Sequence, residues 1–270
     1  MKEDWIGVDL GNTRAKAWCF YAGGSERRFI VPVADADWTE KLLKWRRQVV
    51  PPGTAHSPSV LWWIASVNRE GVSQLQSLLG NASVTAQDRV RLLTHTDVPL
   101  PTSLENPELV GIDRLLAAWA AWQTLHAPLL VVDAGTAITI DWVDAEPRFR
   151  GGAILPGFEM QLAALAEGTS GLKNAVTQLQ RRAVNHDGCD HRFPGTNTAD
   201  AIAAGVYGAV VAAVNAFGQQ VTRIAGSPPR VVMTGGALQG INRLDQQPVM
   251  HVPNIMRQAL LALRTLHTSS

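Results

Sequence analysis

Residues 5–16 of the chain read WIGVDLGNTRAK, and residues 129–139 read LLVVDAGTAIT. Each segment is a short apolar run that closes on Asp-x-Gly with a threonine just beyond. This pattern is typical of a buried strand that ends in a tight turn. Asp9 and Asp133 lie about one domain length, roughly 120 residues, apart. The repetition predicts that the fold uses one structural device twice.

The chain after each turn predicts strand, turn and strand rather than a helix. Glycines or a proline break each stretch into two runs with strand character. A P-loop or a dinucleotide-binding fold would place a helix directly after the glycine turn. The runs are 14–21 and 29–33 after the first turn, and 137–143 and 148–155 after the second.

Helical periodicity fills the remaining intervals, so the pattern favours an α/β fold. Small side chains dominate residues 200–214, which suits a helix packed tightly against its neighbours. With 270 residues, the chain has room for one large or two modest domains. The expected helices are 38–49, 72–79, 113–125, 160–165, 200–220 and 256–266, and further strands are expected at 61–64 and 231–233.

Composition restricts the class of protein. Hydrophobic residues make up 46% of the chain and charged residues 17%, which is ample material for a core. A net charge of +1 provides no field that would attract nucleic acid. No run approaches the roughly 18 apolar residues of a membrane span, and acids stand early in the chain where a secretory signal needs apolar residues. We therefore expect a cytoplasmic protein with neither a nucleic-acid nor a membrane partner.

The first turn has the residue types of a phosphate site. Gly11 allows close approach of the backbone, Asn12 and Thr13 offer hydrogen-bond donors, and Lys16 can place a positive charge nearby. Asp9 would hold hydrated Mg²⁺, because a bare carboxylate repels phosphate. The alternative is an ordinary tight turn in which the aspartate caps its own loop. The second turn favours nucleotide binding, since two such turns facing each other across a cleft can hold both ends of a triphosphate.

A third segment, residues 106–114, reads NPELVGIDR and opens the helix expected at 113–125. Asp113 at the start of that helix is either a helix cap, with Arg114 paired on the surface, or a functional acid. In the functional interpretation Asp113 accepts a proton from a substrate hydroxyl while Arg114 holds an anionic group. The spacing leaves both interpretations open.

Together these segments resemble the type III pantothenate kinases, a group that also contains proteins named Bvg accessory factor. The resemblance extends in order and spacing from residue 9 to the glycine pair at 235 and 236. The motifs are DLGNTRAK at 9–16, GIDR at 111–114, DAGTAIT at 133–139, GGAILPG at 151–157 and NTADAI at 197–202.

This resemblance implies two ribonuclease H-like domains of the actin-like, acetate and sugar kinase superfamily around an interdomain cleft. We expect the domains to be residues 1–120 and 121–270. It also implies a homodimer that phosphorylates pantothenate with ATP, Mg²⁺ and a monovalent cation, K⁺ or NH₄⁺, as the first step toward coenzyme A.

By motif, the resemblance implies residue roles as well. Asp113 is the implied base, Asp133 the implied ligand of the monovalent cation, and Thr198 an implied substrate contact across the dimer interface. Thr136 is an implied ATP contact from the second turn. The other implied contacts are Asp9, Leu10, Gly11, Asn12, Thr13, Arg14, Ala15 and Lys16 for ATP, and Gly111, Ile112, Asp113 and Arg114 for pantothenate.

The chain departs from the family at one position. Leu104 stands where the family commonly has a substrate-contacting tyrosine, seven residues before the glycine of GIDR. This departure motivates one alternative, a related phosphotransferase acting on another small hydroxy acid. The accessory-factor name within the group suggests a second alternative, a non-enzymatic regulatory factor.

Other conspicuous residues are expected to be structural. Cys19 is expected inside a strand, and the tryptophans in core or dimer packing. The pairs Arg46-Arg47 and Arg181-Arg182 are expected at solvated helix ends. The cluster of His186, Cys189, Asp190 and His191 is not expected to bind a metal.

Overall fold

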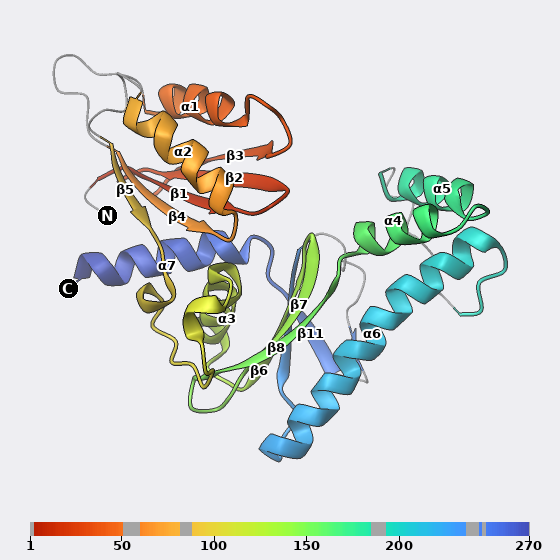
Figure 1. Ribbon diagram of the computed structural model, residues 1–270. Helices are drawn as coiled ribbons and strands as arrows, with labels where there is room; N and C mark the ends of the chain where they lie inside the picture. Colours follow the sequence, from red (N-terminus) through yellow and green to blue (C-terminus); the bar gives the residue numbers. More distant parts are fainter. Residues whose placement is uncertain are drawn as a thin grey trace. The chain divides into compact units, whose positions relative to one another are not determined.

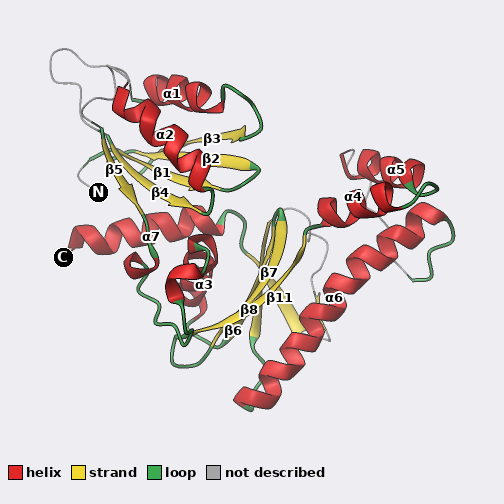
Figure 2. Ribbon diagram, in the orientation of Figure 1, coloured by secondary structure: helices red, strands yellow, loops and turns green. Residues whose placement is uncertain are grey.

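The computed structural model contains two mixed β-sheets and seven α-helices among the residues that it describes (Figures 1 and 2). The described residues are 3–50, 60–81, 88–184, 193–235, 243–244 and 247–269. The fold divides into two compact units, residues 1–124 with 254–270, and residues 125–253. The expected domain boundary between residues 120 and 121 stays a prediction, and the last helix lies in the first unit.

The first unit is built on a five-stranded sheet of order β3-β2-β1-β4-β5. β1 pairs antiparallel with β2 and parallel with β4, and β2 pairs antiparallel with β3. The expected strand, turn, strand sequence after the first turn is therefore confirmed. The strands are β1 (Trp5–Leu10), β2 (Arg14–Phe20), β3 (Glu26–Pro32), β4 (Leu61–Ser66) and β5 (Arg89–Leu92). The helices of this unit are α1 (Trp38–Val49), α2 (Arg69–Asn81), α3 (Ile112–Leu125) and α7 (Ile255–Ser269), with short 3₁₀ turns η1 (His95–Asp97) and η2 (Pro107–Leu109).

β1 is buried on both faces. Ile6, Val8 and Leu10 belong to the same core cluster as residues of α1 and α2. On the opposite face Gly7 lies under α7, where a Cβ would stand 3.2 Å from Leu260 Cδ1. Side chains alternate along a strand, so Asp9 lies on the face of Gly7. Two apolar surfaces on one strand explain why its sequence is almost continuously apolar.

Cys19 lies buried in β2, as expected. Burial raises the pKa of its thiol to about 11. The group therefore stays protonated near neutral pH and packs as a small apolar side chain. The tryptophans of β4, Trp62 and Trp63, are also buried, which confirms a packing role for them.

The second unit repeats this plan around a six-stranded sheet of order β10-β11-β9-β6-β7-β8. β6 pairs antiparallel with β7 and parallel with β9, as β1 does with β2 and β4. Its core cluster joins Leu130, Val132 and Ala134 of β6 to apolar residues of three helices. The strands are β6 (Leu129–Ala134), β7 (Ala137–Val143), β8 (Phe149–Pro156), β9 (Arg230–Gly235), β10 (Arg243–Leu244) and β11 (Gln247–His251), and the helices are α4 (Phe158–Gly168), α5 (Lys173–Val184) and α6 (Thr198–Ala225).

The sequence located most elements but not all of their bounds. α1 has the expected bounds, whereas α2 and α6 begin earlier and end later than expected. The pattern did not predict β5, an edge strand whose side chains are mostly exposed. It also missed α5, whose apolar signal is carried mainly by Val176 and Leu179, three positions apart.

α6 is long and apolar enough to cross a membrane by length and composition alone, and 28% of its most apolar window is buried. A core helix of a soluble protein passes the same test. Val206, Val210 and Val214 pack in the core cluster of the second unit. The close packing expected for this small-residue helix therefore occurs on the side of these valines. The other side, which includes Gly205 and Ala209, is exposed.

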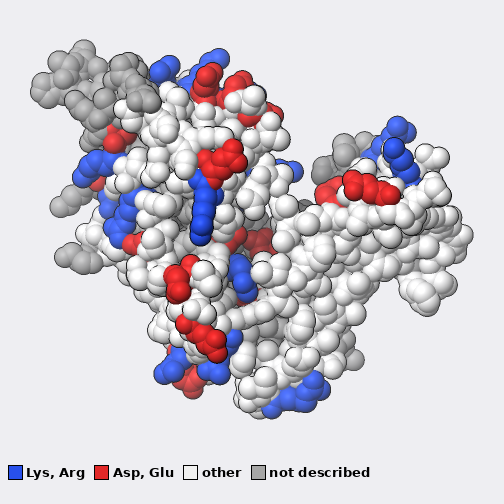
Figure 3. Space-filling model, viewed as in Figure 1, with Lys and Arg blue, Asp and Glu red and all other residues white. Residues whose placement is uncertain are grey.

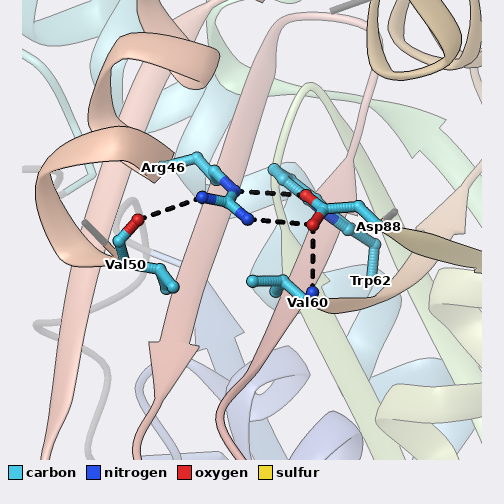
Figure 4. A network of polar contacts seen from close by, with 5 residues as sticks. All are labelled: Arg46, Val50, Val60, Trp62 and Asp88. Atoms are coloured by element: carbon cyan, nitrogen blue, oxygen red, sulfur yellow. Dashed lines mark hydrogen bonds and ion pairs between the residues drawn. The ribbon is translucent and has the colours of Figure 1, made fainter. Parts of the chain in front are cut away.

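The expectation that Arg46 is solvated was wrong. Its side chain and that of Asp88 are each 1% exposed, and they form a bidentate pair with Nε to Oδ2 at 3.1 Å and Nη2 to Oδ1 at 2.9 Å (Figure 4). Asp88 also accepts hydrogen bonds from the Val60 amide and the Trp62 indole, and Arg46 donates to the Val50 carbonyl. Helical periodicity had placed Arg46 near a helix end, but its partner comes from a segment 42 residues away.

Substitution Asp88→Ala should destabilise the protein strongly, because it leaves the buried guanidinium of Arg46 without a counter-charge. We expect a loss of about 3–5 kcal/mol in the free energy of unfolding, measured by urea denaturation. The control is Lys41→Ala, which removes the exposed ion pairs with Asp35 and Asp37 and should leave the midpoint near that of the wild type. Equal midpoints for Asp88→Ala and the wild type would contradict a structural role for the network.

Candidate functional site

The first turn joins β1 to β2 over three residues. The amide of Gly11 donates to the carbonyl of Arg14 at 3.1 Å and closes the turn. Asp9 and Lys16 are opposite each other in the β1–β2 register, and Lys16 Nζ donates to Asp9 Oδ2 at 3.0 Å. The lysine side chain is half exposed, with 38% of it accessible, whereas only 12% of the aspartate side chain is accessible. The turn therefore presents a cation and a carboxylate side by side at the edge of the sheet.

Asn12, Thr13 and Arg14 at the tip of this turn are exposed. The alternating burial of β2 begins only at Ala15. Donor groups on the turn and in its backbone thus lie at the surface, next to Lys16. This arrangement has the donors and the positive charge of an anion site, which stays a prediction, and strand β2 rather than a helix follows the turn.

A second turn of the first unit holds Asp113. The Gly111 carbonyl accepts hydrogen bonds from the amides of Arg114 and Leu115, and Asp113 Oδ1 accepts one from the Arg114 amide at 2.9 Å. A Cβ on Gly111 would lie 2.4 Å from Asp113 Oδ1. The glycine of GIDR therefore leaves room for the carboxylate to fold back over it, and a larger residue would displace the Asp113 side chain.

The end of β4 connects these two turns. Val67 Cγ1 lies 3.2 Å from the position of a Cβ on Gly111. On either side of it, Ser66 and Asn68 hydrogen-bond to the carbonyls of Leu10 and Gly11. The first turn and the Asp113 turn therefore lie at the same edge of the sheet in the first unit. The sequence analysis missed Ser66 and Asn68, although polar residues directly after an apolar strand were the signal that identified Asp9.

The turn between β6 and β7 in the second unit is closed in a similar way but is one residue shorter than the first turn. The amide of Gly135 donates to the Ala137 carbonyl at 3.1 Å, the same distance as in the first turn. Thr136 at its tip is exposed. The Gly157 amide donates to the Thr136 carbonyl at 3.1 Å, and a Cβ on Gly157 would lie 2.1 Å from that oxygen. The last glycine of GGAILPG is therefore needed for close packing on the turn.

The row of side chains across the second sheet differs from that in the first. Asp133 is in register with Thr139 of β7 and Thr234 of β9. Residues in register point to the same face of a sheet, so the row reads Thr, Asp, Thr. At the matching positions of the first sheet, Asp9 lies between Lys16 and Ala65. One turn thus has a fixed positive charge, and the other has a carboxylate flanked by hydroxyl groups.

Thr198 is the first residue of α6 and is exposed. Asn197 caps this helix, since its side-chain oxygen accepts a hydrogen bond from the Asp200 amide at 3.0 Å. The capping places Thr198 at the positive end of a helix of 28 residues. It belongs to the second unit, as do Asp133 and Thr136.

Among the described residues, no three His, Cys, Asp or Glu side chains gather as a metal site. The cluster at 186–191 lies outside the described residues, as does Gly236, the second glycine of the pair that ends the family resemblance.

Comparison with known proteins gives a family. The family described as "Type III pantothenate kinase" matches residues 5–220. Relatives of that name from Rhodopirellula baltica and Paracidovorax citrulli are 37% and 35% identical to the chain, and each alignment covers 96% of this chain and 97% of the relative.

Solved structures are similar at lower identity. A protein from Sinorhizobium meliloti, provisionally assigned as a 2-dehydro-3-deoxygalactonokinase, has a TM-score of 0.60 at 20% identity and covers 97% of this chain and 98% of its own. A ROK family protein from Streptococcus pneumoniae has a TM-score of 0.51 at 11% identity, with coverage of 99% and 100%. The likeness confirms the expected fold class, α/β with two ribonuclease H-like domains.

Substitution Gly157→Ala should disturb the turn between β6 and β7, because the added methyl group meets the Thr136 carbonyl. We expect a loss of about 1–3 kcal/mol in the free energy of unfolding, measured by urea denaturation. The matched control is Gly168→Ala at the end of α4, where a Cβ meets nothing within 4 Å. Equal destabilisation by the two substitutions would show that crowding at the turn is not the cause.

Proposed function

The chain belongs to the type III pantothenate kinase family, and from this premise we propose that its two Asp-x-Gly turns bind ATP beside a pantothenate site at the start of α3. The protein is a kinase that transfers a phosphoryl group from ATP to pantothenate in coenzyme A biosynthesis. The observation that carries the residue assignment is the meeting of the first turn, the end of β4 and the Asp113 turn at one edge of the first sheet.

We assign the ATP phosphates to residues 9–16 and to Thr136. Lys16 and Asp9 already pair at 3.0 Å, and an incoming Mg²⁺–ATP complex offers each a new partner. Lys16 would then contact a phosphate oxygen, and Asp9 would hold the magnesium ion through its hydration shell. The carboxylate oxygens of Asp9, just before the turn, are hard ligands of the kind that Mg²⁺ prefers. When bound, the ion would neutralise part of the phosphate charge.

Asp113 is the base in this proposal. It accepts the proton of the pantothenate primary hydroxyl as that oxygen attacks the terminal phosphorus and ADP leaves. Gly111 and Ile112 shape the backbone around it, and Arg114 faces an anionic group of the substrate. Thr198 completes the pocket from a second chain. Phosphoryl transfer needs positioning and charge neutralisation more than covalent help, and these residues provide both.

We assign the monovalent cation, K⁺ or NH₄⁺, to Asp133. The row of Thr139, Asp133 and Thr234 supplies a carboxylate and two hydroxyl oxygens in register on one face of the sheet. Oxygen donors of this kind suit a hard monovalent cation better than a soft metal. The cation would reduce the repulsion between Asp133 and the ATP phosphates.

We further propose a cytoplasmic homodimer that uses the exposed side of α6. An apolar helix with 28% of its window buried leaves a large apolar surface that a second copy can cover. Small side chains at helical spacing permit close approach of two helices. The surface over α6 is largely uncharged in the space-filling view (Figure 3). The exposed small residues are Ala201, Gly205, Gly208, Ala209, Ala212 and Ala216.

Leu104 remains the observation that favours a different acceptor. Leu104 is half buried, stands seven residues before Gly111, and lacks the hydroxyl group of the tyrosine that is common at this position in the family. An assay of ADP release against pantothenate and a panel of other small hydroxy acids separates the two. Release of ADP only with another acid would change the proposed acceptor substrate, whereas the assignment of the protein as a phosphotransferase would stand.

Substitution Asp113→Asn should abolish proton acceptance while leaving the ATP turn intact. We expect kcat to fall by about 10²-fold or more with little change in ATP affinity, measured by coupled ADP release and by calorimetry. Glu108→Gln, an exposed carboxylate-to-amide change in η2, is the control and should retain wild-type kcat. An unchanged kcat for Asp113→Asn would remove Asp113 from the role of base.

Substitution Ala209→Glu should separate the dimer, because it places a charge in the apolar surface of α6. We expect the wild type to elute as a dimer and the variant as a monomer in size-exclusion chromatography with light scattering. Ala22→Glu, at an exposed turn of the first unit, should stay dimeric. A wild-type monomer, or a dimeric Ala209→Glu variant, would contradict this interface.

A further inference from the structure

The three residues after the core of β4, Ser66, Val67 and Asn68, touch both turns of the first unit. We propose that Ser66 and Asn68 are positioning residues that hold the first turn in the shape that binds the ATP phosphates. This inference rests on the proposed assignment of ATP to residues 9–16. It adds to the site one residue from the end of β4 and one from just before the start of α2, and gives each a defined contact.

Ser66 fixes the peptide between Leu10 and Gly11. β1 and β4 are parallel, with Leu10 and Ser66 in register. Ser66 Oγ donates to the Leu10 carbonyl at 2.9 Å and accepts from the Asn68 amide at 3.0 Å. The other end of the same peptide, the Gly11 amide, donates to the Arg14 carbonyl. Both polar atoms of this peptide are therefore held, and its plane cannot rotate without breaking two hydrogen bonds.

Asn68 acts on the next peptide. Its Nδ2 donates to the Gly11 carbonyl at 3.4 Å, while its Oδ1 accepts from the Gly71 amide at 2.8 Å and so caps α2. In a planar trans peptide the carbonyl and the amide point in opposite directions. Holding the Gly11 carbonyl toward Asn68 thus directs the Asn12 amide away from β4. Backbone amides presented in this way are donors for phosphate.

Val67 lies between the two polar residues and borders the other turn. It is 39% exposed, and its Cγ1 stands 3.2 Å from the position of a Cβ on Gly111. The three residues therefore span from the ATP turn to the segment that carries Asp113. Of the two turns, only the ATP turn receives hydrogen bonds from Ser66 and Asn68. Their loss should therefore weaken ATP binding and leave pantothenate affinity nearly unchanged.

The test separates the two functions of the Asn68 amide. Asn68→Asp keeps an acceptor for the Gly71 amide, and aspartate is as good a helix cap as asparagine. It replaces the donor to Gly11 with an oxygen that repels the Gly11 carbonyl. Loss of one such hydrogen bond corresponds to about a tenfold change, so we expect the Kd for ATP and the KM for ATP to rise about tenfold. The melting temperature and the KM for pantothenate should stay near those of the wild type.

Ser66 gives an independent test with a rescue. Ser66→Ala removes the donor to Leu10 and should also raise the KM for ATP, whereas Ser66→Thr restores a hydroxyl group and should recover much of the affinity. The matched controls are Asn174→Asp and Ser73→Ala, the same chemical changes at exposed helix positions, and both should bind ATP like the wild type.

Wild-type Kd and KM values for ATP in both Asn68→Asp and Ser66→Ala would overturn the inference. So would a lowered melting temperature with unchanged ATP affinity, since that result marks a purely structural role. Weakened ATP binding in the variants supports the positioning role even if the wild type phosphorylates an acid other than pantothenate. A wild-type chain that binds no ATP would overturn this inference and the proposed function together.

Discussion

The central strand of each unit must bury side chains on both of its faces. In β1 every residue is buried, and the only charged one, Asp9, stands next to the last position, where the strand leaves the sheet. An unpaired polar group in the middle of such a strand would carry a large desolvation cost. Polar chemistry is therefore confined to the strand ends and to the turns that follow, and the ends of β1 and β4 lie side by side because these strands are parallel.

The two units place different side chains beside a similarly closed turn. Both turns close with a glycine amide bonded to the carbonyl of the returning strand at 3.1 Å. Beside Asp9 stands Lys16, a permanent positive charge, whereas Asp133 stands between two threonines. A duplicated turn can thus provide a direct phosphate contact in one unit and an oxygen site for a cation in the other, because the side chains in register with the aspartate are free to differ.

The two ion pairs discussed above differ in how many hydrogen bonds their polar atoms already make within the protein. The Arg46–Asp88 network is buried, and each of its oxygen atoms already accepts hydrogen bonds from the protein, so it has little capacity for a ligand. The Lys16–Asp9 pair is held by a single hydrogen bond from Nζ to Oδ2, and its lysine is half exposed, so that Lys16 can turn to a new ligand. Burial and saturation together separate a structural ion pair from a functional one.

The sequence by itself determined the two Asp-x-Gly turns, the strands around them, most helices and the family, because these depend on local periodicity and on motifs that are continuous in the chain. It could not determine that Arg46 is buried or that Ser66 and Asn68 hold the first turn. Those facts depend on pairing between segments 42, 56 and 57 residues apart. Only the tertiary structure decides strand register, and a shift of one residue between β1 and β4 would turn Ser66 to the opposite face of the sheet.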